Sequence, residues 1–372
     1  MKTIVTIARI LTGALFIFSG LVKAIDPRGL AYKMQEFFEV FARENYFKNM
    51  MDAFSEHALT FSIIIITLEI ILGVALLLGW QKKLTTWLLL LLMILFTFLT
   101  SYVLFSGKIE ACGCFGDCIP ITPLQTFTKD IILMLLVLLL LFKREHIHPL
   151  NKPLILSIYI LIALILSLIL QFYVLKNLPV VDCLPFKKGN NILELSKMPA
   201  NAIQDKYDYS FVYEKNGVKK EFAATALPDS TWIFSERKQE LVKKGKNNVP
   251  LINDFKLNGA DGTDSTELIF NSPDEYYLFF LEFPSTDTNE WLKDFRSLTA
   301  SMAGRKKIFL VTSQRTAAEN FLIKNEVLVD AVYTCDATAI KTAARSNPAL
   351  YLMKGAVVID KWGWANFDNT ME

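Results

Sequence analysis

Three consecutive stretches decide the fold: LTTWLLLLLMILFTFLTSYVLF (84–105), ACGCFGDC (111–118) and ITPLQTFTKDIILMLLVLLLLF (121–142). The first and third are long enough to cross the hydrocarbon core of a bilayer, which takes about 20 mostly apolar residues. Three cysteines therefore lie in a loop that joins two predicted membrane spans. What such a loop can do depends on the side of the membrane that it faces.

Hydropathy predicts five spans. Apolar residues make up 52% of the 372 residues, mean hydropathy is +0.34, and the excess lies in the first half of the chain. The predicted spans are 4–25, 59–80, 84–105, 121–142 and 154–175. The first has no small-x-small cleavage site, so we expect a retained helix rather than a signal peptide. After Lys176 the composition is that of an ordinary soluble domain.

The basic residues of the short loops predict the orientation. One face of the five-span arrangement carries Lys2, Lys82, Lys83, Lys143, Arg144 and Lys152, with one acid, Glu145. Basic, acid-poor short loops are retained in the cytoplasm. The N-terminus is therefore predicted to be cytoplasmic. Residues 26–58, the cysteine loop and everything after Lys176 are predicted to lie outside.

The chain has five cysteines, and all of them fall on the predicted outer side: Cys112, Cys114, Cys118, Cys183 and Cys335. Disulfides persist outside the cytoplasm. An odd number leaves at least one thiol free or paired with another molecule.

The Cys112–Cys118 cluster has three interpretations. A Cys-x-Cys disulfide would be strained and readily reduced, which favours an exchange site with Cys118 as the resolving thiol and another protein or a quinone as the redox partner. The alternatives are a static staple with a spare thiol, and a zinc site, for which no fourth ligand is evident. Cys183 could pair with a cluster cysteine or stay free. Cys335 is predicted to be an inert buried thiol, and the alternative is a redox role beside Pro348.

Charged residues inside the spans are a second signal. Glu69 lies near the middle of the second span, where a carboxylate is costly and marks either a functional site or a structural pair. Arg9 is its predicted partner. Lys23 is expected to snorkel to the membrane surface, and Asp130, next to Lys129, to make a packing hydrogen bond.

The soluble half has an α/β pattern. Asn216-Gly217 predicts a β-hairpin within 209–222, and 235–244 is predicted as a short charged helix. Beyond residue 249, the predicted strands are 252–257, 276–283, 307–312, 330–335, 349–353 and 356–361. The predicted helices are 290–303, 317–324 and 338–346. This order implies a sandwich around a mixed sheet.

The membrane half resembles the DoxX/MauE group of bacterial membrane proteins. The resemblance rests on ARILTGALF (8–16), SGLVK (19–23), LEIILG (68–73) and CGCFG (112–116), and it covers roughly residues 1–145. It implies a four-helix membrane bundle, related in architecture to membrane disulfide oxidoreductases. MauE itself is linked to the maturation of a disulfide-rich periplasmic enzyme.

The last part of the chain resembles thioredoxin-like domains of the TlpA kind. The resemblance rests on DFKLNGADG (254–262) and NPALYLMKG (347–355), and it implies a cis-proline at Pro348. The family places Trp-Cys-x-x-Cys after the central strand, but this chain has FPSTDT (283–288), without a cysteine. Oxidoreductase activity is therefore not expected of this domain.

Four parts are predicted: a membrane bundle (1–145), a fifth span (146–177), a linker with a small β-hairpin region (178–248) and a thioredoxin-like domain without Cys-x-x-Cys (249–372). We expect a multi-pass protein of a bacterial inner membrane with a periplasmic C-terminal domain. Its predicted function is thiol–disulfide exchange in envelope protein maturation, as a candidate membrane oxidoreductase. One alternative is a non-catalytic scaffold with structural disulfides and a thioredoxin-like binding surface. Another is the transport or binding of a small hydrophobic molecule near Glu69.

The expected partners are membrane lipid and a periplasmic thioredoxin-like protein or client, which the chain's own thioredoxin-like domain would dock. A net charge of +2 gives no indication of nucleic-acid binding, and no metal is expected.

Overall fold

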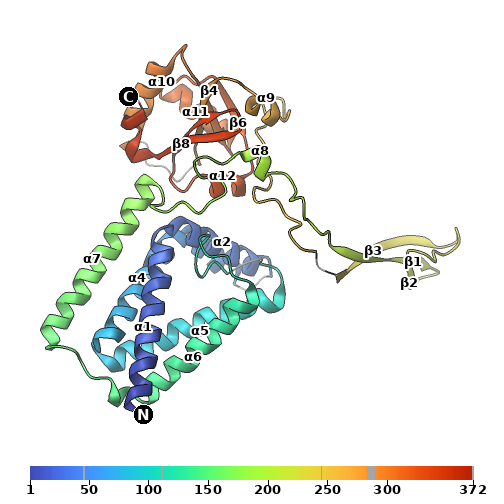
Figure 1. The fold of residues 1–372 in the computed structure, drawn as a ribbon. Helices are drawn as coiled ribbons and strands as arrows, with labels where there is room; N and C mark the ends of the chain where they lie inside the picture. The colour runs from blue at the N-terminus through green and yellow to red at the C-terminus, as the bar shows by residue number, and fades with distance from the viewer. Residues whose placement is uncertain (45–46, 110–111, 244, 283–289, 371–372) are drawn as a thin grey trace.

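The computed structural model describes residues 1–372 except 45–46, 110–111, 244, 283–289 and 371–372. It has a helical N-terminal half and a smaller α/β domain, with a three-stranded arm projecting to one side (Figure 1). Among the described residues, five helices are long and apolar enough to cross a membrane, as predicted: α1 (Lys2–Ala24), α4 (Ala58–Leu78), α5 (Lys82–Ser106), α6 (Pro123–Phe142) and α7 (Pro153–Asn177).

The bundle core lies between α1, α4, α5 and α6. Buried apolar side chains from all four helices meet there, among them Phe16, Leu76, Met93 and Val137. Many leucines and isoleucines on the outer faces of these helices are exposed, which suits contact with lipid. The helix α7 packs against α4, where the buried Gln171 Nε2 donates to Thr67 Oγ1 at 3.0 Å.

Two further helices cover one end of the bundle. They are α2 (Pro27–Arg43) and α3 (Lys48–Glu56), and the sequence patterns did not predict them. The helix α2 begins at Pro27 because the Asp26 side chain accepts a hydrogen bond from Gly29 N at 2.9 Å, a typical N-cap. The end of the bundle that carries α2, α3 and the loop between α5 and α6 is called the cysteine face below.

The α/β domain has a five-stranded mixed sheet in the order β6-β5-β4-β7-β8. Its strands are β4 (Glu275–Phe280), β5 (Lys307–Thr312), β6 (Ala331–Thr334), β7 (Ala349–Lys354) and β8 (Val357–Gly363). The strands β4, β5 and β6 are parallel, whereas β7 and β8 run antiparallel to their neighbours. This is the predicted thioredoxin-like fold, with a cis peptide bond between Asn347 and Pro348 immediately before β7.

Helices cover both faces of this sheet because the β4 side chains alternate between them. Tyr276, Leu278 and Phe280 pack with α9 (Thr266–Phe270) and α12 (Ala337–Ala343). Tyr277 and Phe279 pack on the other face, with α10 (Leu292–Met302) and α11 (Arg315–Lys324). The short 3-10 helices η3 (Trp364–Asn366) and η4 (Asp368–Thr370) follow β8, and η1 (Arg144–His146) follows α6.

The arm interrupts this domain. Its strands β1 (Lys206–Lys215), β2 (Val218–Ala223) and β3 (Ile233–Lys243) form an antiparallel sheet in the order β2-β1-β3. Phe186 and Ile192, which precede the arm, pack in the same core as β4, which follows it. Ile192 begins the one-turn helix α8 (Ile192–Leu195).

Two predicted elements of the soluble half are wrong. Residues 235–244 were predicted as a helix, but 233–243 form β3, which pairs with β1. Every β3 side chain is exposed, so the strand lacks the alternation of apolar and polar residues that would have indicated it. Residues 252–257 form no strand; Phe255 and Leu257 fill the core from an irregular segment instead.

Candidate functional site

The loop between α5 and α6 brings two thiols together. Gly113 and Gly116 have φ values of +71° and +58°, which glycine adopts without steric cost, and Gly116 N donates to Gly113 O at 3.0 Å. Ser19 Oγ of α1 holds the loop by donating to Cys114 O at 3.3 Å. In this turn the Sγ atoms of Cys112 and Cys114 lie 2.8 Å apart, within hydrogen-bonding distance for sulfur.

The two thiols have different acidities. Cys114 is 8% exposed. Its pKa is lowered, first by the hydrogen bond from the Cys112 thiol and then by the charges of Lys129 and Lys23. The same hydrogen bond, together with burial, raises the pKa of Cys112 well above its ordinary value. Cys114 is therefore the better nucleophile of the pair, because the thiolate is the reactive form.

Two ion pairs lie beside Cys114. Lys23 Nζ lies 2.5 Å from Glu69 Oε1, and both side chains are almost fully buried. Lys129 Nζ lies 3.0 Å from Asp130 Oδ1 and also sits over the Phe115 ring. A cavity lies among these four charged residues and Cys114. One thiol of the loop therefore faces two cations and two carboxylates at the end of the bundle.

The predicted pairing of Glu69 with Arg9 is wrong. Arg9 lies near the opposite end of α1 and donates to the carbonyl oxygens of Leu76, Leu77 and His148 at 2.5–3.0 Å. A helix rises about 1.5 Å per residue, so Arg9 and Lys23 are about 20 Å apart along α1. Since α1 and α4 run in opposite directions, Glu69 lies opposite Lys23. The expected snorkelling of Lys23 is also wrong, because its side chain is 4% exposed.

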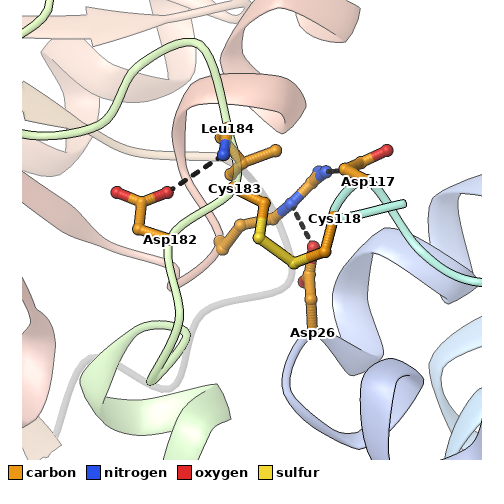
Figure 2. The surroundings of a disulfide bond; sticks show 7 residues. Asp26, Asp117, Cys118, Asp182, Cys183 and Leu184 are labelled. Atoms are coloured by element: carbon orange, nitrogen blue, oxygen red, sulfur yellow. Dashed lines mark hydrogen bonds and ion pairs between the residues drawn. A yellow bond between two sulfur atoms is a disulfide. The ribbon is translucent and has the colours of Figure 1, made fainter. Parts of the chain in front are cut away.

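A disulfide joins Cys118 to Cys183. Their Cα atoms are 4.9 Å apart, their sequence separation is 65, and α6 and α7 lie between them. The bond connects the loop between α5 and α6 to the segment that follows α7 (Figure 2). Of the pairings left open for Cys183, the structure therefore has the one with Cys118. The expectation that Cys118 is the resolving thiol of the cluster is wrong, because its sulfur is already bonded to Cys183.

An arginine of the α/β domain lies beside this disulfide. Arg345 is 6% exposed, and its guanidinium contacts Asp26 Oδ2 at 2.8 Å and Asp117 Oδ2 at 2.6 Å. Burial raises the pKa of Asp26, against the opposing effect of Arg345. Arg345 also donates to Lys341 O at 2.7 Å. The loop before the cis peptide thus contacts the cysteine face directly.

The remaining predicted site residues lie elsewhere. Pro348 follows the Arg345 loop, and Cys335 is buried at the end of β6, where burial raises its pKa to about 11. Residues 283–288, where the family motif would stand, lie outside the described residues. Within the described part of the chain, no group of three or more His, Cys, Asp or Glu side chains could hold a metal ion.

Sequence reasoning missed most of the charged surroundings of the thiols. Lys23 was interpreted apart from the neighbours Lys129 and Asp130, although all three line the cavity beside Cys114. All three residues lie in the predicted spans at about the depth of the cysteine loop, and this common depth could have predicted that they lie close to the thiols. No comparable signal pointed to Arg345, because its two partners lie 228 and 319 residues away in sequence.

Together, the fold and the site define a multi-pass membrane helix bundle with an extramembrane dithiol, joined to a thioredoxin-like domain. Comparisons with known proteins agree. Residues 1–143 match the family described as methylamine utilisation protein MauE, and residues 207–244 match a domain of unknown function, DUF8463. The MauE match confirms the resemblance of the N-terminal half and indicates a multi-pass bacterial membrane protein.

A curated relative is Protein TlpB of Flavobacterium psychrophilum, which is 30% identical over 187 residues. The alignment covers 50% of this chain and 44% of that protein, so the chain spans less than half of the relative's length. No solved structure matches the chain.

Proposed function

We propose that this protein carries out thiol–disulfide exchange at the outer face of a bacterial inner membrane, in the maturation of envelope proteins. The observation that carries the proposal is the Cys112–Cys114 pair, whose sulfurs lie 2.8 Å apart with pKa values shifted in opposite directions. Cys114 attacks the disulfide of a client or partner protein. Cys112 then resolves the mixed disulfide by attacking Cys114, so that the client leaves as a dithiol and the pair is oxidised; the reverse sequence oxidises a client.

The orientation is part of the proposal. Six Lys and Arg residues lie in the short segments opposite the cysteine face, so the positive-inside rule places the cysteine face outside the cytoplasm. The Cys118–Cys183 disulfide supports this placement, because disulfides persist in oxidising compartments. The orientation is tested by labelling Cys114 in intact cells with a membrane-impermeant maleimide. The cells are first treated with a mild reductant, and denatured protein is the positive control. Labelling only after the inner membrane is permeabilised would contradict the orientation.

The exchange itself is tested with redox buffers. The purified full-length protein is equilibrated with mixtures of reduced and oxidised glutathione, and its free thiols are counted after acid quenching. We expect Cys112 and Cys114 to interconvert between dithiol and disulfide, and Cys112→Ser or Cys114→Ser to abolish the two-electron transition. Cys335→Ser is the matched control, because that thiol is buried in the sheet and should not take part. A pair that stays locked in one form across all buffers contradicts the proposal.

A scaffold function is the second candidate, and the contacts of the α/β domain favour it. The Cys118–Cys183 disulfide and the Arg345 ion pairs fix this domain to the cysteine face. On this alternative the cysteines are structural, and the thioredoxin-like fold is a binding surface. The scaffold function predicts that Cys112→Ser and Cys114→Ser leave client disulfides in cells unchanged. The exchange function predicts that, in cells with either variant, client proteins accumulate in the wrong redox state.

A further inference from the structure

A second cavity on the cysteine face reaches the same two thiols. Its volume is about 300 Å³, at the lower end of the range of about 300–1,000 Å³ typical of small-molecule sites. The amphipathic helices α2 and α3 cover the cavity, and α1, α4 and α5 line it on the side of the bundle. Its polar residues gather at one end and include Lys23, Glu69, Cys112 and Cys114.

The rest of the cavity is apolar and rich in aromatic rings. Phenylalanines from α2, α3, α4 and α5 line it, among them Phe37, Phe54 and Phe98. Phe98 and Leu95 are also 54% and 40% exposed on the outer surface of the span α5, so the cavity borders the region where lipid would lie. A molecule dissolved in the bilayer could enter here without crossing water.

The polar end carries unused hydrogen-bonding capacity. Glu69 is fully buried, and within the described part of the structure its Oε2 atom meets no hydrogen-bond partner. Such a buried polar atom is costly unless something else satisfies it. Lys23 Nζ has three donors, and the described residues use two of them, with Glu69 at 2.5 Å and Ser19 Oγ at 2.9 Å. Among the described residues, one carboxylate oxygen of Glu69 and one N–H of Lys23 therefore have no hydrogen-bond partner, and Lys23 Nζ also lies 5.0 Å from the centroid of the Phe96 ring.

We propose that this cavity binds a lipid-soluble quinone, which takes the two electrons of the Cys112–Cys114 dithiol. A flat, apolar ring fits the aromatic lining, one carbonyl oxygen accepts the third Lys23 donor, and a hydroxyl of the reduced ring donates to Glu69 Oε2. An acyl chain would fill the apolar part but would leave Glu69 and Lys23 unsatisfied. The proposal rests on the exchange function above and names its electron acceptor.

The reaction balances with these reactants alone. Two S–H bonds break and one S–S bond forms between Cys112 and Cys114. The two electrons released reduce the quinone, and the two protons go to its two carbonyl oxygens, which become the hydroxyl groups of the hydroquinone. Cys114, the more acidic thiol, loses its proton first, and the thiolate so formed starts the reaction.

The test uses the full-length protein in lipid nanodiscs, reduced and free of oxygen, with decyl-ubiquinone as the probe. We expect one hydroquinone per protein, measured by ultraviolet absorbance, with the loss of two free thiols. Met51 lines the cavity, whereas its neighbour Met50 does not and is 42% exposed. Met51→Trp should slow quinone reduction at least tenfold, and Met50→Trp should leave it unchanged. Both variants should still exchange with oxidised glutathione.

The outcomes separate this inference from the proposed function. If the wild type exchanges with glutathione but does not reduce the quinone, the quinone site is refuted and the exchange function stands. If it does neither, both are refuted. Equal rates for Met51→Trp and Met50→Trp, or a phospholipid that stays bound in the cavity when quinone is added, would also refute the site.

Discussion

Arg345→Met should detach the α/β domain locally from the cysteine face. The substitution keeps the apolar stem of the side chain but removes the charge that contacts Asp26 and Asp117. Removing one partner of a buried ion pair typically costs about 3–5 kcal/mol. Asp117 is 45% exposed, and its pair contributes little because water screens it. We therefore expect Arg345→Met to weaken the docking of the α/β domain on the cysteine face by the lower figure, about 3 kcal/mol.

Since about 1.4 kcal/mol corresponds to a tenfold change in an equilibrium constant, the detached state should become about 100-fold more populated. Amide hydrogen exchange detected by mass spectrometry measures this population. Peptides from the first turn of α2 and from residues 341–348 should exchange about 100-fold faster, while the peptides of β4 keep their rates. Unchanged exchange in the first two regions would refute the assigned role of Arg345.

A double-mutant cycle sharpens this test. Asp26→Asn removes the charge but keeps a good N-cap for α2, so the helix itself should persist. If Arg345 and Asp26 interact as the structure shows, the double variant should be less destabilised than the sum of the two single variants. Strict additivity would mean that the two groups do not interact in solution.

Two further predictions concern the bundle. Cys112→Ala removes the thiol that lowers the pKa of Cys114, whereas Cys112→Ser keeps a hydrogen-bond donor. The rate at which methyl methanethiosulfonate converts Cys114 to its methyl disulfide should therefore reach half its maximum at a higher pH in Cys112→Ala than in Cys112→Ser. A shift in the other direction would contradict the assignment of Cys114 as the more acidic thiol. Gly73→Leu places a Cβ atom 2.8 Å from Gly13 O and 3.0 Å from Ile17 N, so α1 and α4 must separate. The expected cost is about 1–3 kcal/mol, seen as a lower melting temperature in detergent, whereas the exposed Leu91→Val should change little; equal stability of the two variants would count against the packing of α1 on α4.

The sequence predicted elements well where burial imposed a pattern. The five spans follow from long apolar runs, and β4 follows from the continuous run around Leu278, which is buried on both faces of the sheet. The prediction failed for β3, whose side chains all face solvent and whose strand character comes from pairing with β1. An exposed strand carries no hydrophobic pattern that could distinguish it from an exposed helix.

The candidate site divides in the same way. The cysteines of the loop stood out in the sequence because three of them fall within seven residues. The charged residues around these cysteines could not be predicted in the same way, because the pairing of Lys23 with Glu69 depends on how far α1 is offset along α4. A single sequence fixes neither that offset nor the approach of Arg345 to the bundle.

The Cys118–Cys183 bond also has a consequence for the assembly of the protein. The two cysteines lie on the same face but are separated by α6 and α7, so the chain crosses the membrane twice between them. The bond can form only after both helices have been inserted and the later segment has returned to that face. The presence of the Cys118–Cys183 bond therefore shows that α6 and α7 have been inserted. A pulse-labelled chain that carries it has already acquired its final topology.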